Sequence, residues 1–61
     1  MSLANMQRNI LNSVRDKNFQ LCHERGWSVE EREHYINLYD RKHQIIDKFY
    51  GHIALSKYLN N

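Results

Sequence analysis

Amide and carboxylate side chains recur at spacings of three and four in the second half of the chain. They are Glu33, Asn37, Asp40, Gln44 and Asp47. On a helix, at about 100° per residue, they fall within one narrow stripe that ends at Gly51 and contains no Lys or Arg. An amide can orient a water molecule, and a carboxylate can accept a proton or ligate a divalent metal. We therefore take Asp40, Asn37, Asp47 and Gln44 as candidate catalytic residues, with an ordinary solvated helix face as the alternative.

The histidines and the cysteine point to no further chemistry. His34, His43 and His52 lie nine residues apart, whereas metal ligands on one helix lie three or four apart, so we predict no metal site. Cys22 and His23 are neighbours and would point apart on a helix, which excludes a catalytic dyad. Cys22 is expected to be a small core residue.

The elements that would carry these residues are predicted to be helices. Apolar residues before Gly26 recur at helical spacing and predict a helix over 4–25, which Gly26 ends in a left-handed conformation. Ser28 and Glu31 have the spacing of a capping box and predict the start of a second helix. That helix is expected over about 29–50, and the tail after Gly51 forms a short third helix or an extension.

The predicted fold is therefore all-α, an antiparallel two-helix hairpin that makes residues 1–61 a single domain. The absence of proline and the presence of only two glycines among 61 residues favour long helices. A chain this small buries only about 60% of its unfolded surface, which excludes a deep enzyme cleft or a nucleotide-binding fold. The wide apolar stripe of the second helix favours a homodimer in which two hairpins form a four-helix bundle.

The charge and the cysteine content of the chain restrict its expected cellular location and the classes of partner it can bind. The formal net charge is +2, and the basic excess lies in residues 1–25 as Arg8, Arg15, Lys17 and Arg25. A dedicated nucleic-acid binder shows a denser basic face, so direct nucleic-acid binding is not the leading expectation. No apolar run reaches the length of a membrane span, and no signal peptide is visible. One unpaired cysteine fits a reducing compartment, so we expect a cytoplasmic protein.

The segment from Arg15 to Ser28 resembles the first helix and turn of the sporulation stage-zero aspartyl-phosphate phosphatases. An arginine is followed eleven residues later by glycine, and then by an apolar residue and Ser or Thr. The family's second-helix signature, S-Q-E-L-D and a basic residue, falls without gaps on the segment 36–40 followed by Arg41. A second alignment, seven residues further on, falls on 43–47 followed by Lys48. The first keeps the aspartate and replaces glutamine by Asn37, whereas the second keeps both Gln44 and Asp47.

The resemblance implies a helical hairpin that docks on a phosphorylated response regulator and helps water to hydrolyse its aspartyl phosphate. Asn37 or Gln44 would orient the water, and Asp40 or Asp47 would contact the water or the regulator's divalent metal. Glu33, Arg41 and Lys48 would be binding residues beside them. The chain would have no cofactor of its own, because the metal would belong to the partner.

Two other functions remain open. A non-enzymatic helical adaptor or inhibitor would act by protein–protein interaction, with the stripe merely solvated. The segment from Trp27 to Tyr39 also resembles the first helix of a Myb or SANT module, with Trp-Ser, two acids and later aromatics. That resemblance implies a nucleic-acid-associated module, but the chain ends before the further aromatics of a third helix.

Overall fold

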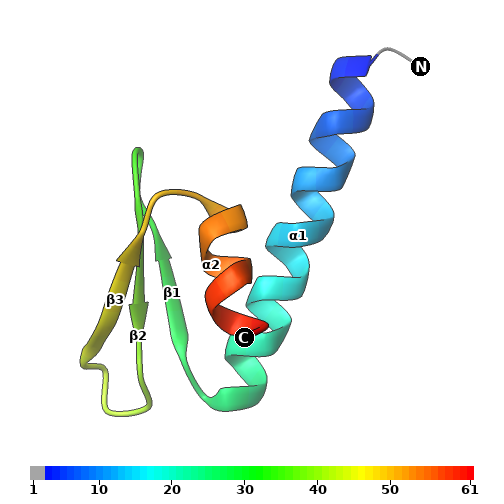
Figure 1. Cartoon of the computed structure of the whole chain (residues 1–61). Coiled ribbons are helices and arrows are strands. Elements are labelled where there is room, and N and C mark those ends of the chain that lie inside the picture. The colour runs from blue at the N-terminus through cyan, green and yellow to red at the C-terminus, as the bar shows by residue number, and fades with distance from the viewer. Residues whose placement is uncertain (1–2) are drawn as a thin grey trace.

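The chain folds as an α+β unit in which both helices cover one face of a three-stranded sheet (Figure 1). The computed structural model describes the backbone of residues 3–61 and the side chains from Asn9 onward. The elements in chain order are α1 (Leu3–Arg25), β1 (Ser28–Glu31), β2 (Ile36–Tyr39), β3 (Ile45–Phe49) and α2 (His52–Leu59). The strands are antiparallel in the order β1-β2-β3, so the sheet is a simple meander.

The end of α1 follows from local sequence. Gly26 has φ 76°, its amide donates to the His23 carbonyl, and the Trp27 amide donates to the Cys22 carbonyl. These two hydrogen bonds form a Schellman motif, which requires a left-handed residue after the last helical turn. The Arg41 side chain also lies against Gly26, and its Nε donates to the Arg25 carbonyl (2.8 Å). A Cβ at position 26 would approach that guanidinium nitrogen to 2.7 Å, so a side chain there would displace Arg41 in addition to straining the positive φ.

The all-α prediction is wrong, because residues 29–50 form the three strands instead of a second helix. Ser28 does not cap a helix but opens β1, where it is the register partner of Tyr39. The four-helix dimer built from two such hairpins is therefore excluded together with the hairpin itself. Helix α1 coincides with the first predicted helix to within one residue, and α2 occupies the predicted C-terminal segment.

The core explains why the strands prevail over a helix. Ile36 and Leu38 in β2 are buried and point to the helices, whereas Asn37 and Tyr39, which alternate with them, face the other side. This two-residue alternation is the period of a strand. The core is completed by residues from the other elements, namely Cys22 of α1, Phe49 of β3, and Leu55 and Leu59 of α2. Four of the five elements thus contribute fully buried or nearly buried apolar side chains.

Helix α1 extends well beyond the rest of the molecule (Figure 1). The principal extents of the chain are 43 × 23 × 17 Å, and the longest direction reflects this extension. Only the C-terminal half of α1 lies beside α2 and β1. We call residues 3–14 of α1 the projecting segment. Within residues 3–61, no helix has the length and apolar character needed to cross a bilayer.

Candidate functional site

Asn37 lies on the sheet face opposite the helices and binds a neighbouring strand. Its Nδ2 donates to Glu30 Oε1 (3.0 Å), and the Tyr39 hydroxyl reaches the same oxygen (3.3 Å). Glu30 and Asn37 are register partners across β1 and β2, and Lys48 is the partner of Asn37 on β3. The Asn37 amide nitrogen is therefore engaged in a cross-strand pair within the sheet.

The hydrogen bonds around Glu30 shift its ionisation. The pKa of its carboxyl is lowered, mainly by the hydrogen bond from Asn37. Desolvation opposes this shift in the pKa, and Arg32, Tyr39 and His43 add smaller lowering contributions. Donors to a carboxylate favour its charged form, which is the physical cause of the shift.

Replacing Asn37 with alanine is expected to raise the pKa of the Glu30 carboxyl towards its ordinary value. In the native chain the carboxylate stabilises the fold above its unfolded pKa. This contribution disappears as the pH falls through the lower folded pKa. An NMR pH titration of the Glu30 side-chain carbon measures the shift in both proteins. The remote Gln20→Ala variant should leave it unchanged, and an equal pKa in wild type and Asn37→Ala would contradict the assignment.

Asp40 and Gln44 close the β2–β3 hairpin. Asp40 Oδ1 accepts the amides of Lys42 (2.9 Å) and Gln44 (3.0 Å), and the Asp40 amide donates to the Gln44 carbonyl. His43 sits in the left-handed region at φ 60°, and its ring stacks on Tyr39 with centroids 4.6 Å apart. A carboxylate that binds the amides two and four residues later is a turn-forming aspartate.

Replacing Asp40 with alanine is expected to lower the free energy of unfolding by about 1–2 kcal/mol, because two loop amides lose a charged acceptor. Asp40→Asn should recover part of the loss, since an amide oxygen can still accept both hydrogen bonds. Chemical denaturation of the three proteins measures the difference. Equal stability of wild type and Asp40→Ala would show that the carboxylate does not hold the loop.

The remaining predicted residues lie in three separate places. Asp47 is exposed on β3, and its Oδ1 accepts the amide of the next residue, Lys48 (2.7 Å). The Lys48 ammonium lies 4.3 Å from the centre of the Tyr35 ring. Arg41 binds the end of α1, as described above, and Glu33 is exposed in the β1–β2 turn.

The structure thus distributes the predicted stripe over strands and turns. It brings together Asn37 with Lys48, and Asp40 with Gln44, but no helix aligns the four amide and carboxylate candidates. Two of the basic residues considered for nucleic acid are bound internally: Arg15 pairs with Glu31 (3.0 Å), and Arg25 Nη2 donates to the Leu59 carbonyl (2.8 Å). Among the described residues, no three His, Cys, Asp or Glu side chains are placed to hold a metal ion.

A polar cluster that the sequence did not reveal joins α1, β1 and the start of α2. Asn18 is completely buried, and its Nδ2 binds both Nδ1 (3.1 Å) and the carbonyl (2.9 Å) of His52. The carbonyl can only accept, so the amide nitrogen faces His52, and Nδ1 must then be the accepting ring nitrogen. The proton of the neutral ring therefore lies on Nε2, which is 3.6 Å from Glu31 Oε2.

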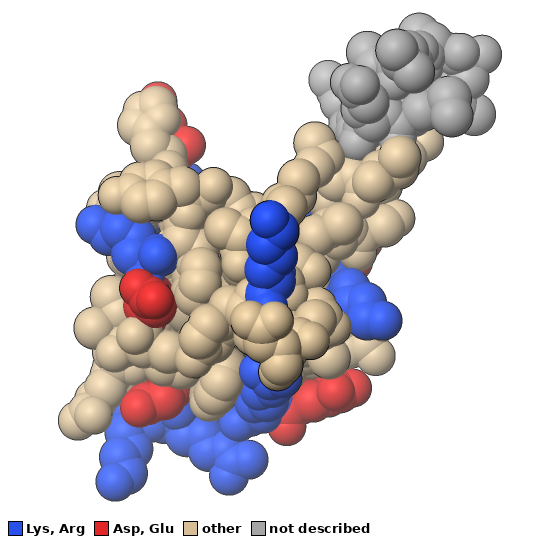
Figure 2. Space-filling model, viewed as in Figure 1, with Lys and Arg blue, Asp and Glu red and all other residues tan. Residues whose placement is uncertain are grey.

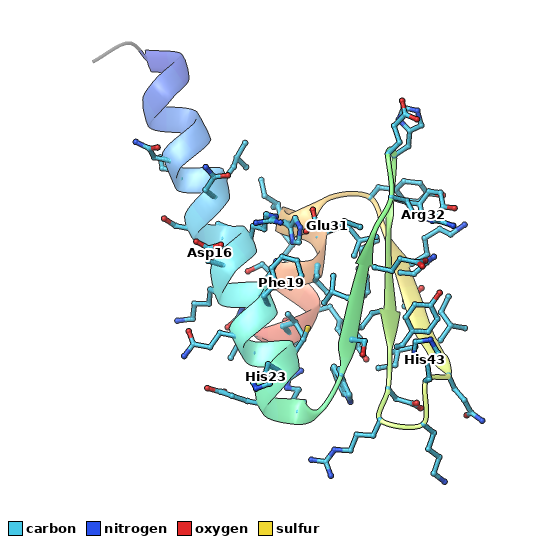
Figure 3. The ribbon with its side chains drawn as sticks, turned by 180° about the vertical axis from the view of Figure 1, so that it is seen from behind. Asp16, Phe19, His23, Glu31, Arg32 and His43 are labelled. Carbon is cyan, nitrogen blue, oxygen red and sulfur yellow. The ribbon has the colours of Figure 1, made fainter. Side chains whose placement is uncertain are left out.

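Arg15 and Phe19 complete this polar cluster. The Arg15 guanidinium lies 4.8 Å from the centre of the Phe19 ring, while its Nε and Nη2 both approach Glu31 Oε1 at 3.0 Å. Phe19 and Glu31 point towards the beginning of α2 from α1 and β1, whereas Arg32 and His43 lie at the other side of the sheet (Figure 3). The cluster joins α1 and β1 to the first residue of α2.

Next to the polar cluster, a cleft of about 360 Å³ opens between α1 and the corner where β3 turns into α2. Its lining residues are Leu11, Asn12, Arg15, Tyr50, Gly51, His52 and Ile53. We call it the corner cleft. Gly51 turns the chain there with φ 112°, and a Cβ on it would meet nothing within 4 Å. The cleft is therefore open at the very point where the polypeptide changes direction.

Cys22 contributes to packing. It is 1% exposed in the core, and burial raises the pKa of its thiol. A thiol with a raised pKa in an apolar environment is a poor nucleophile at neutral pH. The expectation of a small core residue is confirmed.

Comparison with protein-family models, with curated proteins and with solved structures found no match to this chain.

Proposed function

We propose that this chain is a small non-enzymatic protein-binding module that acts by docking a partner on the corner cleft. Four apolar side chains around the cleft support this function: Ile10 is 61% exposed, Leu11 48%, Tyr50 76% and Ile53 55%. Three of them line the cleft itself, and Ile10 is the neighbour of Leu11 on α1. A contiguous exposed apolar surface of this kind marks an interaction site in a soluble protein.

The chemistry of the cleft favours an apolar partner segment over a charged ligand. Arg15 is the charged residue in its lining, and Glu31 already neutralises it within the same chain. His52 is held by Asn18, so its accepting nitrogen is occupied. In Figure 2, the described surface next to the grey atoms is formed by residues other than Lys, Arg, Asp and Glu. We propose that the occupant presents a helix with aliphatic side chains.

Dephosphorylation of a response regulator stays a prediction that the geometry does not favour. This activity requires its residues to share one face of a helix, and Asn37, Asp40 and Asp47 instead lie on two strands and a turn. A cytoplasmic location is likewise proposed, because the one cysteine is buried and unpaired.

The test uses the purified wild-type chain and two variants as bait in parallel pull-down experiments under the same conditions. A partner that binds the wild type should be lost with Ile53→Glu, because a carboxylate in an apolar interface is desolvated without a counter-charge. It should be retained with Lys42→Glu, which changes charge at the distant β2–β3 turn. Circular dichroism checks that both variants fold, and the identified partner is then purified and titrated against all three proteins.

Equal retention by wild type and Ile53→Glu would reject the corner cleft as the docking surface. Faster loss of phosphate from a phosphorylated receiver domain in the presence of sub-stoichiometric chain would replace the proposal with the enzymatic function.

A further inference from the structure

We infer that the corner cleft receives the projecting segment of a second copy of this chain, and that two chains do so reciprocally about a two-fold axis. This inference rests on the proposed function, because it names the partner of the same surface. Reciprocal contact of identical surfaces is the geometry of an isologous dimer, in which residue i meets residue j and residue j meets residue i.

The first argument is the isolation of the projecting segment. The sheet and α2 lie beside the C-terminal half of α1, whereas most of residues 3–14 extends away from them (Figure 1). This segment meets the rest of the chain at the corner cleft, which Leu11 and Asn12 line. A helical segment of that length has little stability in water by itself, since most helix stability in proteins comes from packing an apolar face. Contact with another chain would supply that packing.

The second argument is the distribution of charge along α1. Residues 3–14 contain a single charged residue, Arg8, whereas residues 15–25 contain five. The other polar residues of the segment are uncharged amides and a serine. Charged residues are depleted from the centres of protein interfaces because their desolvation is costly. The projecting segment thus has few charges that an interface would have to desolvate.

The third argument is apolar spacing. Leu3, Met6, Ile10 and Val14 follow each other at intervals of three and four, which places them along one side of a helix. Leu11 adds a neighbouring position on the same element and lines the corner cleft. The apolar lining of the corner cleft is suited to a helix that presents such a row of apolar side chains.

The fourth argument is length. Residues 3–14 span about 18 Å along the helix axis at 1.5 Å per residue. When two such segments lie antiparallel in full overlap, residue 3 of one chain is beside residue 14 of the other. Arg15, the next residue, lines the corner cleft. In that arrangement residue 3 of each chain lies beside the corner cleft of its partner, and one symmetric contact covers both clefts.

Sedimentation velocity of the full chain from about 10 µM to about 1 mM tests the inference. The wild type should pass from monomer to dimer within that range, because an interface of two short helices is small and weak. Leu11→Glu should weaken the dimer by at least about tenfold, since each interface would bury two uncompensated carboxylates. Asn9→Glu is the matched control. It adds the same charge about 160° away from Leu11 on the helix and should change the affinity by less than about twofold.

Hydrogen exchange provides a second readout of the same contact. Amides of the projecting segment should become protected as the concentration of the wild type rises, and should stay unprotected in Leu11→Glu. Dimerisation of Leu11→Glu with wild-type affinity would overturn the inference, and so would a wild type that remains monomeric throughout. If the wild type is monomeric and Ile53→Glu still abolishes binding of a different protein, only the self-association fails and the proposed function stands.

Discussion

Replacing Leu38 with alanine is expected to lower the free energy of unfolding by about 2–5 kcal/mol, the range for removing a buried leucine side chain. Leu38 is 0% exposed and belongs to the central strand, where it packs in the core with side chains of α1, β3 and α2. A domain of this length has a total stability of roughly 3–9 kcal/mol, at 0.05–0.15 kcal/mol per residue. We therefore expect Leu38→Ala to be partly or largely unfolded at room temperature.

Urea denaturation followed by far-ultraviolet circular dichroism measures this loss. Ile45→Ala on β3 is the matched control, because Ile45 is 58% exposed and its removal leaves no cavity. Its free energy of unfolding should change by less than about 1 kcal/mol. A similar loss in both variants would show that the sheet is stabilised by strand residues in general and not by the core around Leu38.

Replacing Asn18 with alanine is expected to cost about 2–4 kcal/mol, although it removes a polar side chain from the interior. The loss leaves the carbonyl and Nδ1 of His52 without their donor, and each unpaired buried polar atom costs about 1–3 kcal/mol. Because His52 is the first residue of α2, the effect should include loosening of that helix from α1.

Two comparisons separate this explanation from a simple cavity effect. Asn18→Leu fills the space but supplies no donor, so it should remain destabilised by at least about 1 kcal/mol. Gln20→Ala, at an exposed position of α1, should be neutral within about 0.5 kcal/mol. Hydrogen exchange at the α2 amides should rise in Asn18→Ala and stay at the wild-type level in Gln20→Ala. Wild-type stability of Asn18→Leu would contradict the role of the amide.

Helix α1 and its end could be predicted because their determinants are local. The apolar spacing and Gly26 lie within one continuous segment, and the hydrogen bonds that end the helix join residues no more than five positions apart. Such interactions form in much the same way whatever the rest of the chain does. This explains why the sequence alone located α1 to within one residue.

The strands could not be predicted from the same kind of signal. Ser28 and Glu31 match a helix start locally, but their conformation is decided by pairing with β2, which begins eight residues after Ser28. The β1–β2 turn at Glu33 and His34 contains no glycine and no residue with positive φ, so the usual mark of a tight hairpin is absent. The β-branched and aromatic residues of 35–50 were the available signal, since such residues favour strands.

The polar cluster lay beyond prediction for a different reason. Asn18 and His52 are 34 residues apart, and neither has a neighbour in sequence that marks it as buried. Their proximity depends on how α2 returns across the sheet to α1. Only a correct topology could have placed an amide of the first helix beside the first residue of the last one.

The carboxylate of Asp47 affects the free edge of the sheet at β3. β3 is an outer strand, and an outer strand normally offers free amides to the strand of any neighbouring molecule. Here the Lys48 amide already donates to Asp47, and the two residues place opposite charges on that strand. A chain approaching edge to edge would have to displace the carboxylate before it could add a strand. The β3 edge of this small sheet is thereby less open to strand addition.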